Sequence, residues 1–295
     1  ATTTGDDNTA VGAFALLSNT TATAGTAIGY ETLRNNSTGT FNTALGWRVL
    51  RNNTTGFNNT ASGRQALYSN TTGSSNVAYG YGALYSNTTA GSLTAVGAQA
   101  LNANTTGTSN SAFGYQALYS NTTGANNIAM GAGSMAANTS GQYNVAVGKS
   151  ALGSNTTGGD NTAFGPLSLW YNTTGNWNTA VGTTSLQSNT TGGGNTAFGH
   201  RALQANTTAF RNTAYGYRTL YYNTTGAGNT AVGGYALQNS TTSSNLTAVG
   251  YEALKSNTTG TNNVATGYQA LYTNTTGASN TAVGTSTLFS NTTGY

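Results

Sequence analysis

Apolar and polar residues return to the same places along this chain with a 17-residue period. The glycine that closes the first part of the repeat stands at Gly12, Gly29 and Gly46 and continues at the same interval to Gly284. We number the repeat from the residue four places before this glycine, which is usually Asn. Position 3 is then always Ala, position 9 is Leu in every copy except Met135, and positions 12–14 read Asn-Thr-Thr with a few Ser replacements. A fixed short period predicts a solenoid of stacked coils.

Positions 1–5, as in residues 178–182, predict a short strand that glycine ends. Position 4 is usually large and apolar, as in Val11 and Phe113, and position 2 is mostly Thr. These two positions share one face of a strand, so we expect that face to look inward. The invariant Ala on the opposite face indicates a steric ceiling, set either by the far wall of the same coil or by another chain.

Positions 6–11, as in residues 115–120, predict a second strand or a single helical turn, because six residues are too few for periodicity to decide. Positions 6, 7 and 10 vary freely, which predicts exposure, and positions 12–15 form a polar turn. The predicted fold class is all-β: a β-solenoid or β-roll of seventeen 17-residue coils. Residues 1–295 are expected to be a single repeat array without caps, a segment of a longer chain.

Composition limits the partners that the chain is expected to have. The net charge of +4 is spread over 295 residues, too thinly for a nucleic-acid footprint. The sequence contains no Cys and no apolar run long enough to span a membrane, and no signal peptide is recognised. Only 5% of residues are charged, but 10% are aromatic and apolar residues recur in register, which favours order over disorder.

Catalysis is not expected, because titratable groups are few and far apart. The one histidine, His200, stands at the variable position 6. The acids are Asp6, Asp7, Glu31, Asp160 and Glu252, and only the adjacent Asp6 and Asp7 could act on one substrate. No metal-ligand cluster, calcium loop or phosphate-binding loop is recognised, so no cofactor is predicted.

The Asn-Thr-Thr turn supplies an Asn-x-Ser/Thr acceptor for N-glycosylation in every copy. Where position 12 becomes Ser240, the preceding Asn239 restores one. The alternative is a stacked Asn ladder whose Thr hydroxyls bond the turn backbone and carry no sugar. The candidate acceptors are Asn19, Asn36, Asn53, Asn70, Asn87, Asn104, Asn121, Asn138, Asn155, Asn172, Asn189, Asn206, Asn223, Asn239, Asn257, Asn274 and Asn291.

Aromatic residues recur at positions 6 and 10, as in Tyr115 and Tyr119. Their rings either cover the edge of the core or present a surface that stacks on sugars or on a partner fibre. Arginines lie among them, but the columns are too interrupted to favour single-stranded nucleic acid. The regular Thr ranks at positions 2, 13 and 14 raise ice binding as an alternative function, although positions 13 and 14 belong to a turn and do not form a flat array.

The segments Asn229-Thr-Ala-Val-Gly233 and Asn280-Thr-Ala-Val-Gly284 resemble the Ala-x-Gly repeats in the YadA-like heads of trimeric autotransporter adhesins. The full repeat is similar to the repetitive shafts of some phage tail fibres and bacterial surface fibres. This resemblance covers the whole chain and implies an extracellular fibre or adhesin shaft, on a cell or virion surface, that self-associates as a homotrimer or filament. The adhesin heads have shorter repeats than this chain, and no coiled-coil stalk or membrane anchor lies within its sequence.

Overall fold

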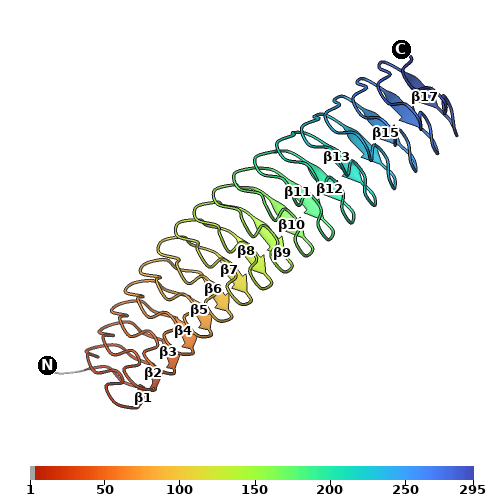
Figure 1. The fold of residues 1–295 in the computed structure, drawn as a ribbon. Coiled ribbons are helices and arrows are strands. Elements are labelled where there is room, and N and C mark those ends of the chain that lie inside the picture. Colours follow the sequence, from red (N-terminus) through yellow and green to blue (C-terminus); the bar gives the residue numbers. More distant parts are fainter. Residues whose placement is uncertain (1–3) are drawn as a thin grey trace. The chain divides into compact units, whose positions relative to one another are not determined.

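The computed structural model describes residues 4–295, which form two compact units, residues 4–144 and 145–295. In each unit the chain winds through successive coils, and each coil contributes one short strand (Figure 1). Every strand is three residues long, and the strands recur with the 17-residue period of the sequence. The predicted all-β solenoid and its period are confirmed, and residues 4–295 contain no helix.

The strands of each unit lie side by side in a parallel ladder. The first unit contains β1 (Thr9–Val11), β2 (Thr26–Ile28), β3 (Thr43–Leu45), β4 (Thr60–Ser62), β5 (Val77–Tyr79), β6 (Thr94–Val96), β7 (Ser111–Phe113) and β8 (Ile128–Met130). The second contains β9 (Val145–Val147), β10 (Thr162–Phe164), β11 (Thr179–Val181), β12 (Thr196–Phe198), β13 (Thr213–Tyr215), β14 (Thr230–Val232), β15 (Thr247–Val249), β16 (Val264–Thr266) and β17 (Thr281–Val283).

Neighbouring strands pair in register, so that each position of the repeat becomes a column running from coil to coil. Thr43 lies beside Thr60 and Ala44 beside Ala61, and the same offset of one repeat holds for every pair within a unit. Parallel pairing sets the coils about 4.8 Å apart. Any feature present in every copy is therefore repeated along the unit at this spacing.

The face of the strand that looks inward is opposite to the predicted one. Position 3 points inward, as in the fully buried Ala112, whereas position 4 points outward, as in Phe113 and Tyr215, which are 38% and 54% exposed. The interior of a 17-residue coil is narrow, so a close-packed site there accepts nothing larger than Ala. The coil's own interior thus sets the steric ceiling, and the outward position 4 tolerates residues from Ser to Tyr.

Positions 6–11 form a turn instead of the second strand or helical turn that the sequence left open. Positions 7 and 9 have left-handed backbone, as in Gln116 (φ 54°) and Leu118 (φ 52°). This conformation is costly for residues with a Cβ, but burying the Leu offsets it by about 1.5–3 kcal/mol. The Gln116 N–H donates to the Ala98 carbonyl of the preceding coil and the Leu118 N–H to the Ser134 carbonyl of the following coil. The turn therefore bonds to both neighbouring coils.

The invariant glycine at position 5 is required by both conformation and contact. Gly97 has φ 136°, in a region that side chains rarely adopt. A Cβ built there would lie 2.5 Å from the carbonyl oxygen of Gly114 in the next coil. Only glycine satisfies both constraints, which explains why no copy departs from it.

The predicted exposure of positions 6, 7 and 10 is confirmed only for position 6, where most side chains are exposed. At position 7, Glu31 and Glu252 are buried, and position 10 is half-buried in every coil after the first. These side chains extend over a neighbouring coil, as where Gln116 Nε2 donates to Gln99 Oε1 at 3.0 Å. Positions 7 and 10 therefore vary because different side chains can make these contacts between coils, and not because the positions are exposed.

Candidate functional site

The asparagines of position 12, here called the inner Asn column, lie inside the coil. Three of the predicted glycosylation sites are half-buried: Asn19, Asn239 and Asn291. The other candidates are at most 1% exposed, namely Asn36, Asn53, Asn70, Asn87, Asn104, Asn121, Asn138, Asn155, Asn172, Asn189, Asn206, Asn223, Asn257 and Asn274. The column is therefore part of the core in both units.

Most asparagines of the inner column are bonded both along the axis and across their own turn. Asn53 Nδ2 donates to Asn36 Oδ1 at 2.7 Å and to the Gly56 carbonyl oxygen at 2.9 Å. Asn53 Oδ1 in turn accepts from Asn70 Nδ2 at 2.7 Å. An N-linked sugar would replace one of the two Nδ2 hydrogens, both of which are used here. The geometry fits the ladder alternative, while the glycosylation of these residues stays a prediction.

A second ladder, at position 1, was not recognised in the sequence and is here called the strand Asn column. Asn59 Nδ2 donates to the Gly73 carbonyl oxygen at 2.9 Å, and Asn59 N–H donates to Asn42 Oδ1 at 3.0 Å. The same Gly73 carbonyl also accepts from Asn70 Nδ2 of the inner column at 2.9 Å. The two columns thus share one row of carbonyls. The sequence did contain a signal for this column. Asn recurs at position 1, on the same face of the strand as the invariant Ala, and a buried amide would explain this recurrence.

The two threonines of the turn have different environments. Position 13 is half-buried through most of the chain, and its hydroxyl bonds the next coil, as where Thr54 Oγ1 donates to the Thr71 carbonyl oxygen at 3.1 Å. Position 14, from Thr21 to Thr293, is exposed in every coil. No hydroxyl of position 14 has a hydrogen bond to another residue within 4–295. Position 13 is therefore structural, and position 14 faces solvent.

The aromatic columns form short stacks along the surface. Tyr68 and Tyr85 stack at 5.2 Å between ring centroids, and Tyr251 and Tyr268 at 5.9 Å. The exposed His200, as predicted, is a surface residue, and its ring stacks on Tyr217 at 5.8 Å. Offset contacts at these distances are favourable. Many rings are thus partly covered by their neighbours, as expected of rings that cover the edge of the core.

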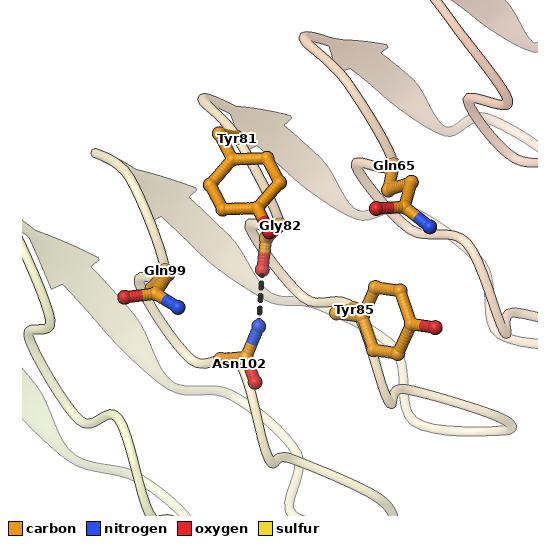
Figure 2. Close-up of a pocket in the computed structure, with 6 residues that line it drawn as sticks. All are labelled: Gln65, Tyr81, Gly82, Tyr85, Gln99 and Asn102. Atoms are coloured by element: carbon orange, nitrogen blue, oxygen red, sulfur yellow. Dashed lines mark hydrogen bonds between the residues drawn. The ribbon is translucent and has the colours of Figure 1, made fainter.

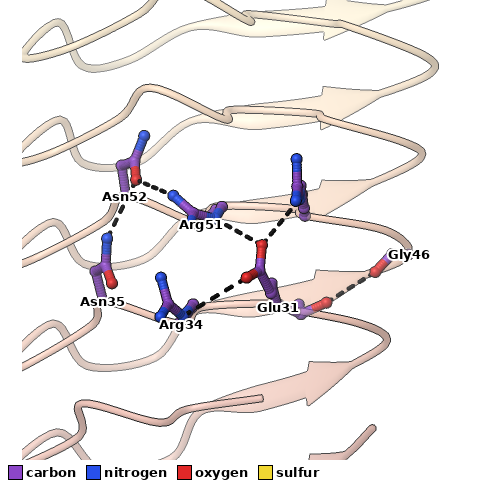
Figure 3. A network of polar contacts seen from close by, with 8 residues as sticks. Glu31, Arg34, Asn35, Gly46, Arg51 and Asn52 are labelled. Carbon is purple, nitrogen blue, oxygen red and sulfur yellow. Dashed lines mark hydrogen bonds and ion pairs between the residues drawn. The ribbon is translucent and has the colours of Figure 1, made fainter. Parts of the chain in front are cut away.

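The largest charged cluster of residues 4–295 surrounds Glu31 in the first unit, with Arg34 on the same coil and Arg51 on the following coil (Figure 3). The Nε atoms of Arg48 and Arg51 each lie 2.8 Å from Glu31 Oε2, and Arg34 Nε lies 3.7 Å from Oε1. Arg51 also donates to Asn52 Oδ1 at 3.2 Å. The hydrogen bond from Arg51 lowers the pKa of Glu31; burial opposes this, and the charges of the three arginines lower the pKa further. The carboxylate is therefore held in its charged form.

A smaller cluster surrounds Glu252 in the second unit. Lys255 Nζ lies 2.6 Å from Glu252 Oε1, and Gln269 Nε2 donates to Oε2 at 2.7 Å. Burial raises the pKa of Glu252, but the hydrogen bonds from Lys255 and Gln269 and the charge of Lys255 outweigh it, so the net shift is downward. Glu252 in turn raises the pKa of Lys255, chiefly through the same hydrogen bond. Both clusters tie position 7 to position 10, and each pairs its acid with a base.

The surface of the first unit has a notch of about 240 Å³ at Gly82, which occupies position 7 (Figure 2). The missing side chain leaves a gap between Gln65 and Gln99, which carry the same position in the two flanking coils. Asn102 Nδ2 donates to the Gly82 carbonyl oxygen at 2.9 Å, and the ring of Tyr85 lines the opposite side. The notch offers neutral amides and an aromatic face, a combination suited to hydroxyl-rich ligands.

Residues 4–295 contain no group of three or more His, Cys, Asp or Glu side chains that could hold a metal ion. Asp6, Asp7 and Asp160 are exposed, and Glu31 and Glu252 are used in the clusters described above. No helix that could span a membrane is found among the same residues. The titratable groups are thus surface residues or members of small ion pairs.

No family model, no curated protein and no solved structure matches this chain. The shape of the coil alone does not distinguish an adhesin head from a fibre shaft, so the resemblance to both stays an expectation. The repetitive β-solenoid is typical of structural proteins.

Proposed function

We propose that the chain is a structural segment of an extracellular fibre, such as the shaft of an adhesin, on a cell or virion surface. The observation that carries this proposal is the near equivalence of the coils within a unit. They bond their neighbours through the same backbone pairs and, apart from the few replaced asparagines, through the same two Asn columns. A chain of equivalent units provides length and a repeated surface without requiring a single specialised site. We also propose that the chain has no catalytic activity.

Self-association, as a homotrimer or a filament, is proposed through the outward face of the strands. This face carries exposed apolar side chains in successive coils of a unit, as at Ile28 (38%) and Leu45 (48%) in the first and Phe198 (42%) and Tyr215 (54%) in the second. Contiguous exposed apolar residues are typical of interaction surfaces. No charged residue stands at positions 2 or 4 in any copy, so nothing on the face repels a second copy.

Ice binding is the alternative function, and the structure sharpens what it would require. Thr at position 2 does face outward, but it alternates with position 4 side chains that range from Ser to Tyr. The position 13 hydroxyls are bonded to backbone in most coils, as at Thr71 (3.0 Å). The outward face is therefore uneven, and a thermal-hysteresis assay without activity would remove this alternative.

Carbohydrate binding through the aromatic columns is the remaining alternative, and the notch at Gly82 favours it. Gly82 interrupts a row of glutamines whose intact part, Gln99 and Gln116, is bonded side chain to side chain. A neutral sugar ring entering the notch would meet the amides of Gln65 and Gln99 and the ring of Tyr85. Such a site would be an addition to the fibre rather than a substitute for it.

Immunogold electron microscopy of intact source cells or particles tests the main proposal. Antibodies raised against the folded chain are expected to label filaments outside the cell or particle. Label confined to the interior would contradict an extracellular fibre. Excision of residues 110–126, one whole repeat, serves as the matched internal test: the shortened chain is expected to keep its β-sheet circular dichroism and to label the same filaments.

A further inference from the structure

We infer that the position 14 hydroxyls, from Thr21 to Thr293 and including Ser140, are acceptors for O-linked sugars. The inference rests on the proposed function, because it assigns the sugar coat of an extracellular fibre to defined atoms. It places the sugar on a hydroxyl outside the coil, in contrast to the predicted asparagine acceptors of position 12.

The position 14 side chain is exposed in every coil, and its hydroxyl makes no hydrogen bond within residues 4–295. One residue earlier, the hydroxyl is used: Thr54 Oγ1 and Thr71 Oγ1 donate to carbonyl oxygens of the next coil at 3.1 and 3.0 Å. Folding thus explains the threonine at position 13. It gives no reason for a hydroxyl at position 14. The only hydrogen bond that this position donates in the described part of the chain is from its backbone N–H, as at Thr55, and any residue except proline can supply that donor.

Other outward positions show what the chain tolerates where folding imposes no side chain. Most residues of positions 6 and 17 are exposed, like those of position 14. Position 6 is occupied by Ala, Tyr, Trp, Arg, Lys, Pro, Thr, His or Gly, and position 17 by Asp, Ala, Phe, Asn, Ser, Tyr, Trp, Gly or Arg. Position 14 has remained Thr in every copy except Ser140, which keeps the hydroxyl. The hydroxyl itself is therefore what is retained, and an O-linked modification requires this group and nothing else of the side chain.

The competing acceptor is enclosed by the fold. Asn70 Nδ2, for example, is fully buried and donates both hydrogens, to Asn53 Oδ1 at 2.7 Å and to the Gly73 carbonyl oxygen at 2.9 Å. A sugar there would break one of these bonds and would have to leave through the turn. A sugar on Thr72 Oγ1 would project into solvent and leave the ladder unchanged.

The chemistry is a glycosyl transfer from a nucleotide-activated sugar, carried out by a separate glycosyltransferase. The threonine oxygen forms a bond to the anomeric carbon, and the bond from that carbon to the diphosphate breaks. The nucleoside diphosphate leaves, and a base of the transferase takes the hydroxyl proton. Acceptors repeat about every 4.8 Å along a unit, so the sugars would lie ring upon ring. With only 5% charged residues, a sugar coat would supply the solubility that charge usually provides.

Mass spectrometry of the protein purified from the cells that make it tests this inference. Peptides are fragmented by electron transfer, which keeps sugars attached. We expect hexose-sized mass increments on the side chains of position 14 and none on those of positions 12 and 13. Unmodified peptides, or sugar localised to asparagine, would overturn the inference. An extracellular fibre that immunogold detects but that carries no sugar would leave the proposed function standing while the inference fails.

Two matched variants, expressed in the same cells, separate modification from folding. The triple variant T55A/T72A/T106A is expected to lose the increments at these three residues while keeping its melting temperature before and after chemical deglycosylation. The control T54A/T71A/T105A is expected to keep the increments and to melt at a lower temperature, because it loses hydrogen bonds of 3.0–3.1 Å to the next coil. Unchanged total sugar in the first variant would overturn the inference.

Discussion

The inner Asn column and the strand Asn column are both buried, yet they differ in what they tolerate. The strand column contains Leu93 and Leu246, which are 1% exposed, and Gly25. The inner column departs from Asn once, at Ser240. Both columns donate to the same row of carbonyls, so the difference lies in what each Oδ1 accepts.

In the strand column, Oδ1 accepts from the backbone N–H of the next coil, as Asn42 Oδ1 does from Asn59 at 3.0 Å. The next side chain adds a longer bond in many coils, here from Asn59 Nδ2 at 3.1 Å, but the backbone donor remains whatever that side chain is. Where Leu93 replaces Asn, its own N–H still donates to Asn76 Oδ1 at 3.0 Å. The next residue of the column, Asn110, then has no acceptor for its N–H within residues 4–295, although its Nδ2 still donates to Gly124. One unsatisfied donor costs about 1–3 kcal/mol, and burial of the Leu side chain offsets much of it.

In the inner column, Oδ1 accepts from the next asparagine side chain, so a replacement disturbs two buried amides. At Ser240 the hydroxyl oxygen and Asn223 Oδ1 are both buried without a hydrogen-bond partner. Ser243, which replaces the usual Gly of position 15, partly compensates by accepting from Asn257 Nδ2 at 3.1 Å. The inner column, in which Oδ1 depends on the next side chain for its donor, is therefore the less tolerant of the two.

The largest expected effect is a difference in stability between one substitution in each Asn column, made in adjoining coils. Asn53→Leu should destabilise the chain by about 3 kcal/mol, because Asn36 Oδ1 loses its donor and Asn70 Nδ2 loses an acceptor. Asn59→Leu should cost at most about 1 kcal/mol, since Leu93 and Leu246 show that the site accepts this side chain. Urea unfolding followed by circular dichroism measures both. Equal midpoints for the two variants would refute the distinction.

An effect of intermediate size, in the stabilising direction, is expected from restoring Asn where Ser240 interrupts the inner Asn column. Ser240→Asn should raise stability by about 1–2 kcal/mol, because the new side chain offers a donor to Asn223 Oδ1 and removes the unsatisfied hydroxyl. Ser256→Asn, at the half-buried position 11, is the control and should change little. Thermal unfolding compares the two. A loss of stability in Ser240→Asn would show that the interior of this coil has closed around the smaller residue.

The contrast between the columns also shows how far the sequence can predict this molecule. The 17-residue period predicted the solenoid, and the Asn-Thr-Thr repeat correctly indicated an Asn ladder as one alternative. The face of the strand that looks inward was predicted wrongly, because the large residues of position 4 indicated a core, whereas the interior at position 3 admits only Ala. The contacts of Glu31 with two arginines of the following coil could not be predicted, since they depend on left-handed backbone at position 7. The notch at Gly82 could not be predicted for the same reason, because Gly82 also occupies position 7.

The smallest expected effect concerns charge instead of amides and distinguishes the Glu31 cluster from the pH-insensitive Asn columns. The pKa of Glu31 lies below its ordinary value of 4.5 in the folded chain, mainly because of the hydrogen bond from Arg51. A lowered folded-state pKa contributes stability above the unfolded-state pKa, and this contribution is lost as the pH falls through the folded-state value. Glu31→Gln should therefore melt below the wild type near neutral pH and converge with it in acid.

Melting curves of the wild type and Glu31→Gln from about pH 7 to about pH 2 measure this convergence. The chain has only five acids, so few other carboxylates titrate over this range. Glu252 also has a lowered pKa, and it is present in both proteins, so its contribution cancels in the difference. The arginines around Glu31 are partly exposed, and added salt should reduce the gap near neutral pH. A difference that persists unchanged in acid would mean that the side chain acts through shape and neutral hydrogen bonds, as the asparagines do.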